Sequence, residues 1–480
     1  MTVHRRLALT ASVVGAVIVA LDGTALTVAQ PALQRALGAS FAQVQWTSTG
    51  YLIAVASLLV FSGRLGDRYG HQRLFAVGML GFGAASAGIG LASGIGWMIG
   101  LRVVQGVFGA LLQPATLGML RAAYPPDRLR KPIAVRTAAI GVAAAVGPVV
   151  GGALVAGPGW RSVFFLNVAP AVVLGGLALC GPGHRWAMAG QGPRQLPSRQ
   201  APKQTLAARL DVPGALLLAL TLAGLVHTLV ALPDAGWTTA GEAGAVLVAA
   251  AAFVRHERRT ASPLLPPDVV GSATVGSALG ILVAASAALH GTLFVGAYVL
   301  QYTLGLDAFQ SALRSLPLAV MMVAAAPAGA VLLPRAGARR TTVTAMAVLA
   351  LGILLLIRAS GTLALCAGFG LLGAGFGTVM VAATHVVVRH SAVESAGVAG
   401  GAKQTAMNVG PTLGVAAATV LMGAGGGRAL PLVVLASVAV AGAAVGGLLP
   451  GRAAGAVDDL CDTADDLGDA GPRSSVPARR

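Results

Sequence analysis

Asp22 is the one carboxylate deep inside a long hydrophobic run, the stretch from Leu7 to Ala29. An ionised side chain at the centre of a membrane is costly, so an acid in such a run is a functional candidate by default. Because a low dielectric disfavours the charged form of an acid, a carboxyl group there can take up and release a proton. Its position therefore predicts proton handling, and an acid that merely bonds to a neighbouring helix is the alternative.

Arg102 is a second charge inside an apolar run, from residue 97 to residue 120. A guanidinium group in such a place must pair with something. One possibility is an acid such as Asp22. The other is a set of backbone carbonyls that hold the helix in place.

The composition indicates that these charges lie in a membrane. Hydrophobic residues make up 56% of the 480 residues and charged residues only 10%, and the mean hydropathy is +0.80. Soluble domains contain about 25% charged residues. Cys180, Cys366 and Cys461 form neither a disulfide framework nor a metal-ligand spacing. The sequence shows no phosphate loop and no nucleophile with a base at local spacing, which argues against an ATP-driven pump and an enzyme.

Apolar runs of membrane-spanning length recur along the chain, and a helix needs about 20 apolar residues to cross a bilayer. They predict an all-α integral membrane protein with fourteen transmembrane helices. The expected spans are 7–29, 43–62, 74–93, 97–120, 133–156, 162–180, 212–232, 240–254, 273–300, 313–333, 342–357, 362–388, 395–422 and 430–449.

Basic residues favour one set of alternate loops. The opposite loops hold only Arg35, Arg161, Arg358 and Arg428 of the 33 Lys and Arg residues. Arg102, Arg314 and Lys403 fall within spans, and the remainder lie in the N-terminus, the tail and the loops on the same side. This bias predicts that both termini are cytoplasmic. The net charge of +17 is therefore a topology signal, and we expect no nucleic-acid partner.

The two ends of the chain repeat each other. Residues 33–38 match residues 300–305, and residues 147–151 match 410–414, at offsets of 267 and 263. Spans 1–6 thus recur as spans 9–14, as in transporters built from parallel repeats. The predicted units are a six-helix bundle over 1–180, a cytoplasmic linker with two inserted helices over 181–271, a second bundle over 272–450 and a disordered tail over 451–480.

His290 stands opposite Asp22 in this repeat, because residues 21–24 match residues 289–292 at an offset of 268. A titratable side chain at the equivalent position is a candidate for proton coupling. A histidine bonded to a neighbouring helix is the alternative.

A short connection after span 2 carries Gly63, Asp67, Arg68, Gly70 and Arg73. Its glycines permit a tight turn between two helices. Its acid can accept hydrogen bonds from a helix N-terminus or a basic side chain. A turn that only sets the topology is the alternative to a gating role.

Span 5 carries a glycine–proline motif, made of Gly147, Pro148, Gly151 and Gly152. The proline removes one helix bond and tends to kink the helix. The glycines at 147 and 151 form a small face for close helix packing.

These motifs resemble those of the major facilitator superfamily, and the stretches 21–31, 159–168 and 210–215 resemble its fourteen-span drug:proton antiporters. The resemblance implies two six-helix bundles with two inserted central helices. It also implies that Asp22 is the coupling acid with Arg102 as a possible partner, that the loop after span 2 is a gate, and that span 5 marks an antiporter.

The implied function is proton-driven efflux of a lipophilic drug or antibiotic by alternating access, which would confer resistance, including self-resistance in an antibiotic producer. Proton-coupled movement of another small solute on the same fold is the alternative. We expect a multi-pass monomer in the bilayer of a bacterial cytoplasmic membrane, with the proton gradient as energy source and no cofactor or metal. Candidate residues of the substrate cavity, each of which could equally be packing, are Trp46, Tyr51, Gln105, Gln113, Phe294, Tyr298, Gln301 and Asn408.

Overall fold

The structure is a computed structural model that describes residues 3–125, 128–180, 211–231, 236–260, 263, 272–389, 396–423 and 427–449. The expected tail lies outside these residues, and so does nearly all of the expected linker. Within the described part, fourteen helices are long and apolar enough to cross a membrane, which confirms the predicted number. The limits of the predicted domains stay a prediction.

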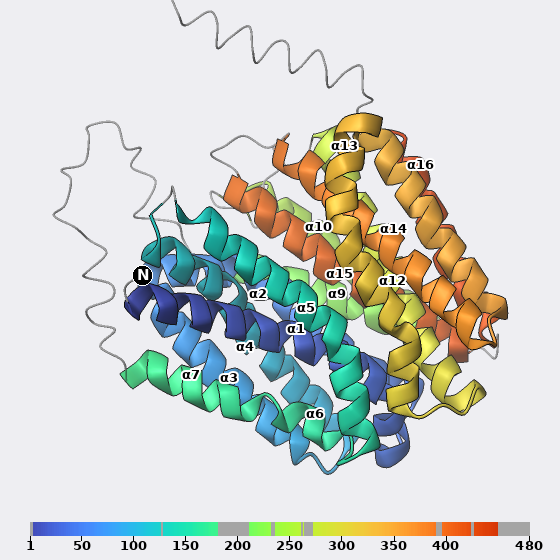
Figure 1. Cartoon of the computed structure of the whole chain (residues 1–480), viewed down its shortest axis with the longest axis horizontal. Helices are drawn as coiled ribbons and strands as arrows, with labels where there is room; N and C mark the ends of the chain where they lie inside the picture. Colours follow the sequence, from blue (N-terminus) through green and yellow to red (C-terminus); the bar gives the residue numbers. More distant parts are fainter. Residues whose placement is uncertain are drawn as a thin grey trace, which may run out of the picture.

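The helices follow one another with short connections (Figure 1). In the first half they are α1 (Val3–Leu37), α2 (Phe41–Tyr69), α3 (His71–Gly90), α4 (Ile95–Ala123), α5 (Arg130–Ala156), α6 (Arg161–Phe165) and α7 (Val168–Cys180). The inserted pair is α9 (Val212–Ala231) and α10 (Trp237–Glu257). The second half contains α12 (Ala273–Tyr298), the π-helix η3 (Val299–Thr303), α13 (Ala308–Arg358), α14 (Thr362–Arg389), α15 (Ala396–Gly423) and α16 (Ala429–Gly446).

Helices suit these apolar sequences because a helix satisfies its own backbone hydrogen bonds where no water can do so. Two spans are interrupted or joined in a way that the apolar pattern does not predict. Span 6 is made of α6 and α7, which are separated by a turn at Leu166 and Asn167. Helix α13 contains two spans joined at Gly337, whose φ of 78° breaks the helix.

The backbone repeats the sequence repeat. Positive φ angles occur at Gly38 (59°), Gly70 (96°) and Gly159 (98°) in the first half, and at Gly305 (66°), Gly337 (78°) and Gly427 (56°) in the second. The pairs are 267, 267 and 268 residues apart. Glycine adopts such angles without the steric cost that other residues meet. The matching turns support the predicted parallel repeat.

Side-chain contacts repeat as well. Ser40 accepts a hydrogen bond from the backbone of Gln43 and caps α2, and Asp307 caps α13 through Gln310 in the same way. Likewise, Arg161 donates to the carbonyl of Ala92, and Arg428 donates to the carbonyl of Ala359. Each element of the first half thus has its counterpart 267 residues later, although the side chains differ.

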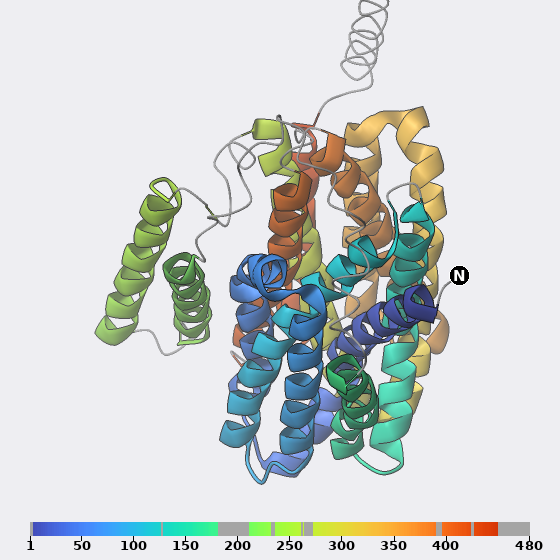
Figure 2. The same ribbon diagram turned by 90° about the vertical axis from the view of Figure 1, so that its left-hand side faces the viewer.

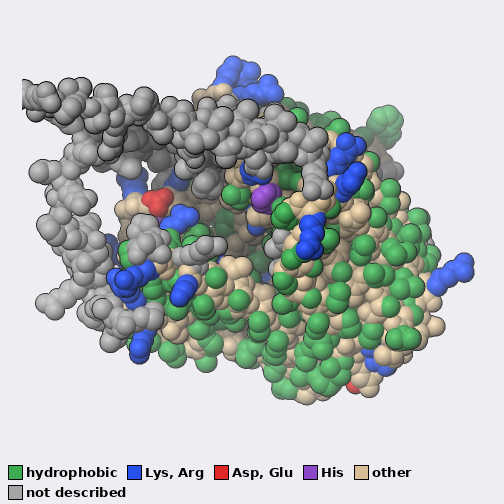
Figure 3. Space-filling model, turned by 45° about the horizontal axis from the view of Figure 1, so that its top comes forward, with side chains coloured by type: hydrophobic (Ala, Val, Ile, Leu, Met, Phe, Trp, Pro, Cys, Tyr) green, Lys and Arg blue, Asp and Glu red, His purple; other side chains and the backbone are tan. Residues whose placement is uncertain are grey.

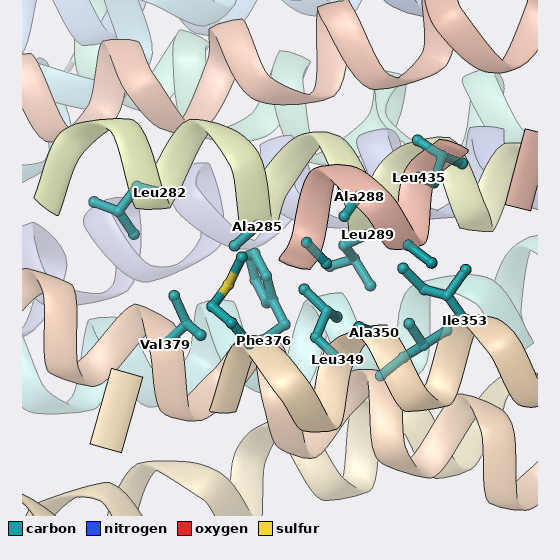
Figure 4. Close-up of a cluster of buried hydrophobic side chains, with 14 of the residues drawn as sticks. Leu282, Ala285, Ala288, Leu289, Leu349, Ala350, Ile353, Phe376, Val379 and Leu435 are labelled. Atoms are coloured by element: carbon teal, nitrogen blue, oxygen red, sulfur yellow. The ribbon is translucent and has the colours of Figure 1, made fainter. Parts of the chain in front are cut away.

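The core of the second bundle is made of aliphatic and small residues. Leu282 and Leu289 of α12, Ile353 of α13 and Phe376 of α14 point toward one another in Figure 4. A helical pair, α9 and α10, stands at the side of the two bundles (Figure 2). Helix α9 packs against α2 and α15, while α10 packs against α9. The inserted helices are therefore central in the sequence and peripheral in space.

The bundles meet at the membrane face opposite the one where α1 begins, which we call the opposite face; the other is the N-terminal face. At the opposite face, Gln301 Nε2 donates to the carbonyl of Val28 at 2.9 Å, and Tyr302 Oη donates to the carbonyl of Pro31 at 3.2 Å. The ring of Phe41 lies 4.9 Å from that of Tyr298. Together these contacts connect the ends of α1 and α2 with the end of α12 and η3.

Candidate functional site

Asp22 of α1 and Arg102 of α4 form an ion pair in the centre of the first bundle. Arg102 Nη1 lies 2.7 Å from Asp22 Oδ2, and their relative exposures are 1% and 0%. Two buried charges at this separation compensate each other, whereas either alone would be strongly unfavourable. The arrangement therefore answers what each of these two intramembrane charges contacts.

Three further polar side chains complete this buried cluster. Asn167 Nδ2 donates to Asp22 Oδ1 at 2.9 Å. Gln105 Nε2 donates to the same oxygen at 3.2 Å and to Ser86 Oγ at 2.7 Å. The carboxylate thus accepts from three side chains, and hydrogen bonds to a charged group are stronger than neutral ones. The cluster holds Asp22 as an ionised, fully bonded acid in this conformation.

Arg102 is held on its other sides by a backbone carbonyl, an amide and two aromatic rings. Its Nε donates to the carbonyl of Thr47 at 2.8 Å, and its Nη1 donates to Gln105 Oε1. The guanidinium carbon lies 4.5 Å from the centre of the Tyr51 ring and 5.9 Å from that of Phe164. Cation–π contacts of this kind are favourable in a dry site. Both readings of Arg102, an acid and a carbonyl as partner, therefore hold at once.

The glycine–proline motif of α5 packs directly against α1 beside this cluster. A methyl group at Gly147 would collide with the hydroxyl of Thr24, and one at Gly151 would lie 2.8 Å from Cα of Ala25. At Gly152 it would lie 2.6 Å from the carbonyl oxygen of Ala308, on α13 of the other bundle. Helix α5 therefore connects the helix that carries Asp22 with the interface between the bundles.

The segment predicted as a loop after span 2 is mostly helical, which corrects the expected tight turn at two glycines. Helix α2 continues to Tyr69, so Gly63 lies inside it. Only Gly70 turns the chain, with a φ of 96° and a ψ of 128°. A helix continues here because close helix packing, and not a turn, is a sufficient use for a glycine in a membrane.

His71 fills a slot in this turn. Its ring lies against Gly66 and Gly118, where an added methyl group would come within 2.4 Å and 2.3 Å of the imidazole. Its Nε2 lies 3.1 Å from Asp67 Oδ1. The carboxylate of Asp67 is 76% exposed. The gating residues Asp67, Arg68 and Arg73 thus lie at the N-terminal face, and their predicted role stays a prediction.

His290 does not enter the cluster of Asp22. Its Nδ1 donates to the carbonyl of Ser286 at 2.9 Å on the same helix, and its ring meets that of Phe376 edge to face at 6.5 Å. These contacts hold the imidazole within the second bundle. Its suggested coupling role stays a prediction.

The structure separates the eight cavity candidates into different places. Tyr51 and Gln105 belong to the buried charged cluster, Phe294 and Tyr298 stack in α12, and Gln301 bridges the bundles. Trp46 packs near α9. Gln113 is half-buried on α4, and Asn408 is buried on α15 with an amide nitrogen that finds no partner among the described residues.

Asn167 is the site residue that the apolar pattern leaves unmarked. It sits at the turn between α6 and α7, which directs its amide to Asp22. The chain contains two asparagines, and this is the one in the first half. An amide inside an apolar run was the available signal, because polar groups in a membrane need partners.

Relatives of known family match most of this chain. It is 37% identical, over 88% of its length and 77% of the relative's, to the tetracenomycin C resistance and export protein of Streptomyces glaucescens. It is 34% identical to a puromycin resistance protein of Streptomyces alboniger, with 83% and 78% of the two chains covered.

A probable actinorhodin transporter of Streptomyces coelicolor is 33% identical over 86% of this chain and 72% of that relative. Among solved structures, a bacterial homologue of the human lysosomal transporter Spinster in an inward-facing, occupied conformation aligns with a TM-score of 0.63 at 14% identity. The alignment covers 93% of this chain and 97% of that one, and it shows a shared fold. The family model of the Major Facilitator Superfamily matches residues 13–255. With this match and relatives of such identity and coverage, the chain belongs to the Major Facilitator Superfamily, as its motifs predict.

Proposed function

We propose that this protein exports a lipophilic antibiotic across a bacterial cytoplasmic membrane in exchange for protons and thereby makes the cell resistant. The buried pair of Asp22 and Arg102 carries the proposal, because it is an acid that can be neutralised by a proton inside a transporter fold. The names of its relatives, among them resistance and export proteins for tetracenomycin C and puromycin, supply the substrate class. Self-resistance of an antibiotic producer agrees with these names.

The coupling step that we propose begins with protonation of Asp22. A neutral carboxyl group no longer compensates the charge of Arg102, so the arrangement of α1 and α4 loses the main attraction that stabilises it. Because Gly147 and Gly151 fit α5 tightly against α1, a shift of α1 moves α5 as well. Through Gly152 this movement reaches α13 of the other bundle. The proton thus biases the contact that closes the opposite face.

The orientation follows from the basic bias of the loops. We place the N-terminal face, and with it both termini, in the cytoplasm. The contacts from Gln301 to Val28 and from Tyr302 to Pro31 then close the protein toward the outside. Figure 3 shows a hollow with basic side chains around it on the N-terminal face. In this state a monomer in the bilayer would admit its substrate from the cytoplasm, with the proton gradient as energy source and no cofactor.

Uptake into everted membrane vesicles tests the proposal. We expect tetracenomycin C or puromycin to accumulate when a proton gradient is imposed. Asp22→Asn should abolish this accumulation while the protein still inserts, because the amide keeps the size of the acid but cannot bind a proton reversibly. Glu242→Gln is the matched control: it changes an acid in α10 that lies 3.7 Å from His227, far along the chain from the cluster.

Two results would contradict the proposal. Undiminished accumulation by Asp22→Asn would remove this acid from the mechanism. Accumulation that survives collapse of the gradient would remove antiport itself, and with it the need for any proton site.

A further inference from the structure

A groove between α14 and α15 combines an apolar lining with two basic side chains. It has a volume of about 440 Å³ and is lined by Met380, Val381, Thr384, His385, Val388 and Lys403. Sites for small molecules usually have volumes of about 300–1,000 Å³, with mostly apolar walls and a few polar groups. The groove therefore has the size and the lining of a binding site.

Lys403 is a cation without a carboxylate partner. It lies in the span Gly400–Gly423 and is half-buried. Over the described part of residues 272–449, Asp307 is the one acid, and it caps α13 at the opposite face. No hydrogen bond or ion pair of Lys403 occurs within the described residues. Since a charge in a membrane-spanning segment is kept only where it is compensated, this ammonium group calls for an anion from outside the bundle.

The groove borders the interface between the two bundles. Gly401, two residues before Lys403, faces α2 so closely that an added methyl group would lie 3.3 Å from Val60 Cγ2. Val381 contacts α13 at Gly329 in the same way, at 3.0 Å. The groove thus lies in the half of the second bundle nearer the N-terminal face, where Figure 3 shows the hollow. A compound that enters from that face would meet it.

We propose that this groove binds the acidic group of a lipophilic organic anion, such as a carboxylate or phenolate, and that such anions are the preferred substrates. The inference rests on the proposed export function and names its substrate class. The ammonium of Lys403 compensates the charge, His385 can donate a second hydrogen bond, and Met380 and Val388 contact the apolar body. A lipophilic cation of the same shape would be repelled by Lys403.

Binding of two matched probes to the full-length protein tests this substrate class. The probes are anthraquinone-2-carboxylate and its neutral carboxamide, and equilibrium dialysis measures their affinity for protein in phosphatidylcholine nanodiscs. We expect the carboxylate to bind at least ten-fold more tightly than the amide. Lys403→Gln should remove this preference and leave the affinity for the amide unchanged, and Lys403→Arg should retain it.

Arg314→Gln is the matched control. Arg314 is also a basic residue in a span of the second bundle, but it is exposed and contacts Thr362 near the opposite face. Its removal should change neither affinity. A general effect of net charge would lower carboxylate binding in both variants and would overturn the assignment of the site.

Other outcomes also decide the question. Equal affinity for the two probes, no binding of the carboxylate, or the same loss of both probes in Lys403→Gln would overturn the proposal. Displacement of the carboxylate by phosphatidylglycerol in the nanodiscs would identify the groove as a lipid headgroup site instead. Failure of the export function would appear separately, as absent gradient-driven uptake with the binding preference intact.

Discussion

At the scale of single residues, Asp22 and Arg102 depend on each other because neither can reach water. Removal of one partner from a buried ion pair costs about 3–5 kcal/mol, since the other charge is left uncompensated. We therefore expect Arg102→Met to lower the thermal unfolding temperature of the purified protein markedly. The double variant with Asp22→Leu should recover most of this loss, because it removes both charges from the same site.

The comparison of the two variants separates pairing from packing. Arg102 also lies over the rings of Tyr51 and Phe164. If these contacts provided most of its stabilising effect, the double variant would unfold at or below the temperature of Arg102→Met. Thermal unfolding in detergent, followed by size-exclusion chromatography after heating, distinguishes the two outcomes.

The sequence marked the two charges of this cluster but not its geometry. Asp22 and Arg102 are conspicuous because each is a charge in an apolar run, whereas their contact joins residues 80 positions apart and depends on how α1 packs on α4. Asn167 was missed because it lies at a break in span 6 that the hydropathy pattern does not show. Gln105 was noticed for its polarity and given a different place.

At the scale of elements, the connection between α2 and α3 depends on one glycine. Gly70 has a φ of 96° and a ψ of 128°, a conformation that costs other residues about 1–3 kcal/mol. Gly63 is helical, and an added methyl group would lie 3.8 Å from Pro114 Cβ, an ordinary contact distance. We expect Gly70→Ala to lower the unfolding temperature and Gly63→Ala to leave it nearly unchanged. A larger effect at Gly63 would mean that the turn tolerates strain or that α2 moves.

A second prediction concerns the contact between α5 and α13. Gly152→Ala places a methyl group 2.6 Å from the carbonyl oxygen of Ala308, so the two helices must separate at the opposite face. We expect at least a ten-fold loss of gradient-driven transport in vesicles. A thiol at position 311, introduced by Ser311→Cys, should become reactive toward an impermeant maleimide added to whole cells. In the otherwise unchanged protein this residue is 3% exposed.

Gly176→Ala provides the control for this prediction. An alanine there meets nothing within 4 Å, and Gly176 lies in α7, away from the interface between the bundles. Transport and labelling should match those of the unchanged protein. Normal transport by Gly152→Ala would show that the close approach of α5 and α13 is not required for closure.

At the scale of the whole molecule, most of the architecture was readable from the sequence. Span length and polarity predict the fourteen helices, and the offset of 267 predicts turns at equivalent glycines, such as Gly70 and Gly337. Which face is closed could not be read, because alternating access lets one sequence adopt more than one arrangement of the same two bundles. The closure depends instead on contacts between bundles, such as that of Gln301 with Val28.

A reversible cross-link tests whether the bundles must separate at the opposite face. In protein with its native cysteines replaced by serine, Val28→Cys and Gln301→Cys place thiols on the two sides of this contact. A short bifunctional thiosulfonate should lower vesicle transport at least ten-fold, and a reductant should restore it, because a linked contact cannot open outward. The control pair, Gln30→Cys and Ser48→Cys, joins two helices of one bundle whose side chains bond at 2.7 Å. Cross-linking there should leave transport intact, since each bundle moves as a unit. Transport that continues through a linked Val28–Gln301 pair would refute rocking about the bundle interface, and equal inhibition by both pairs would show that motion within the first bundle is required.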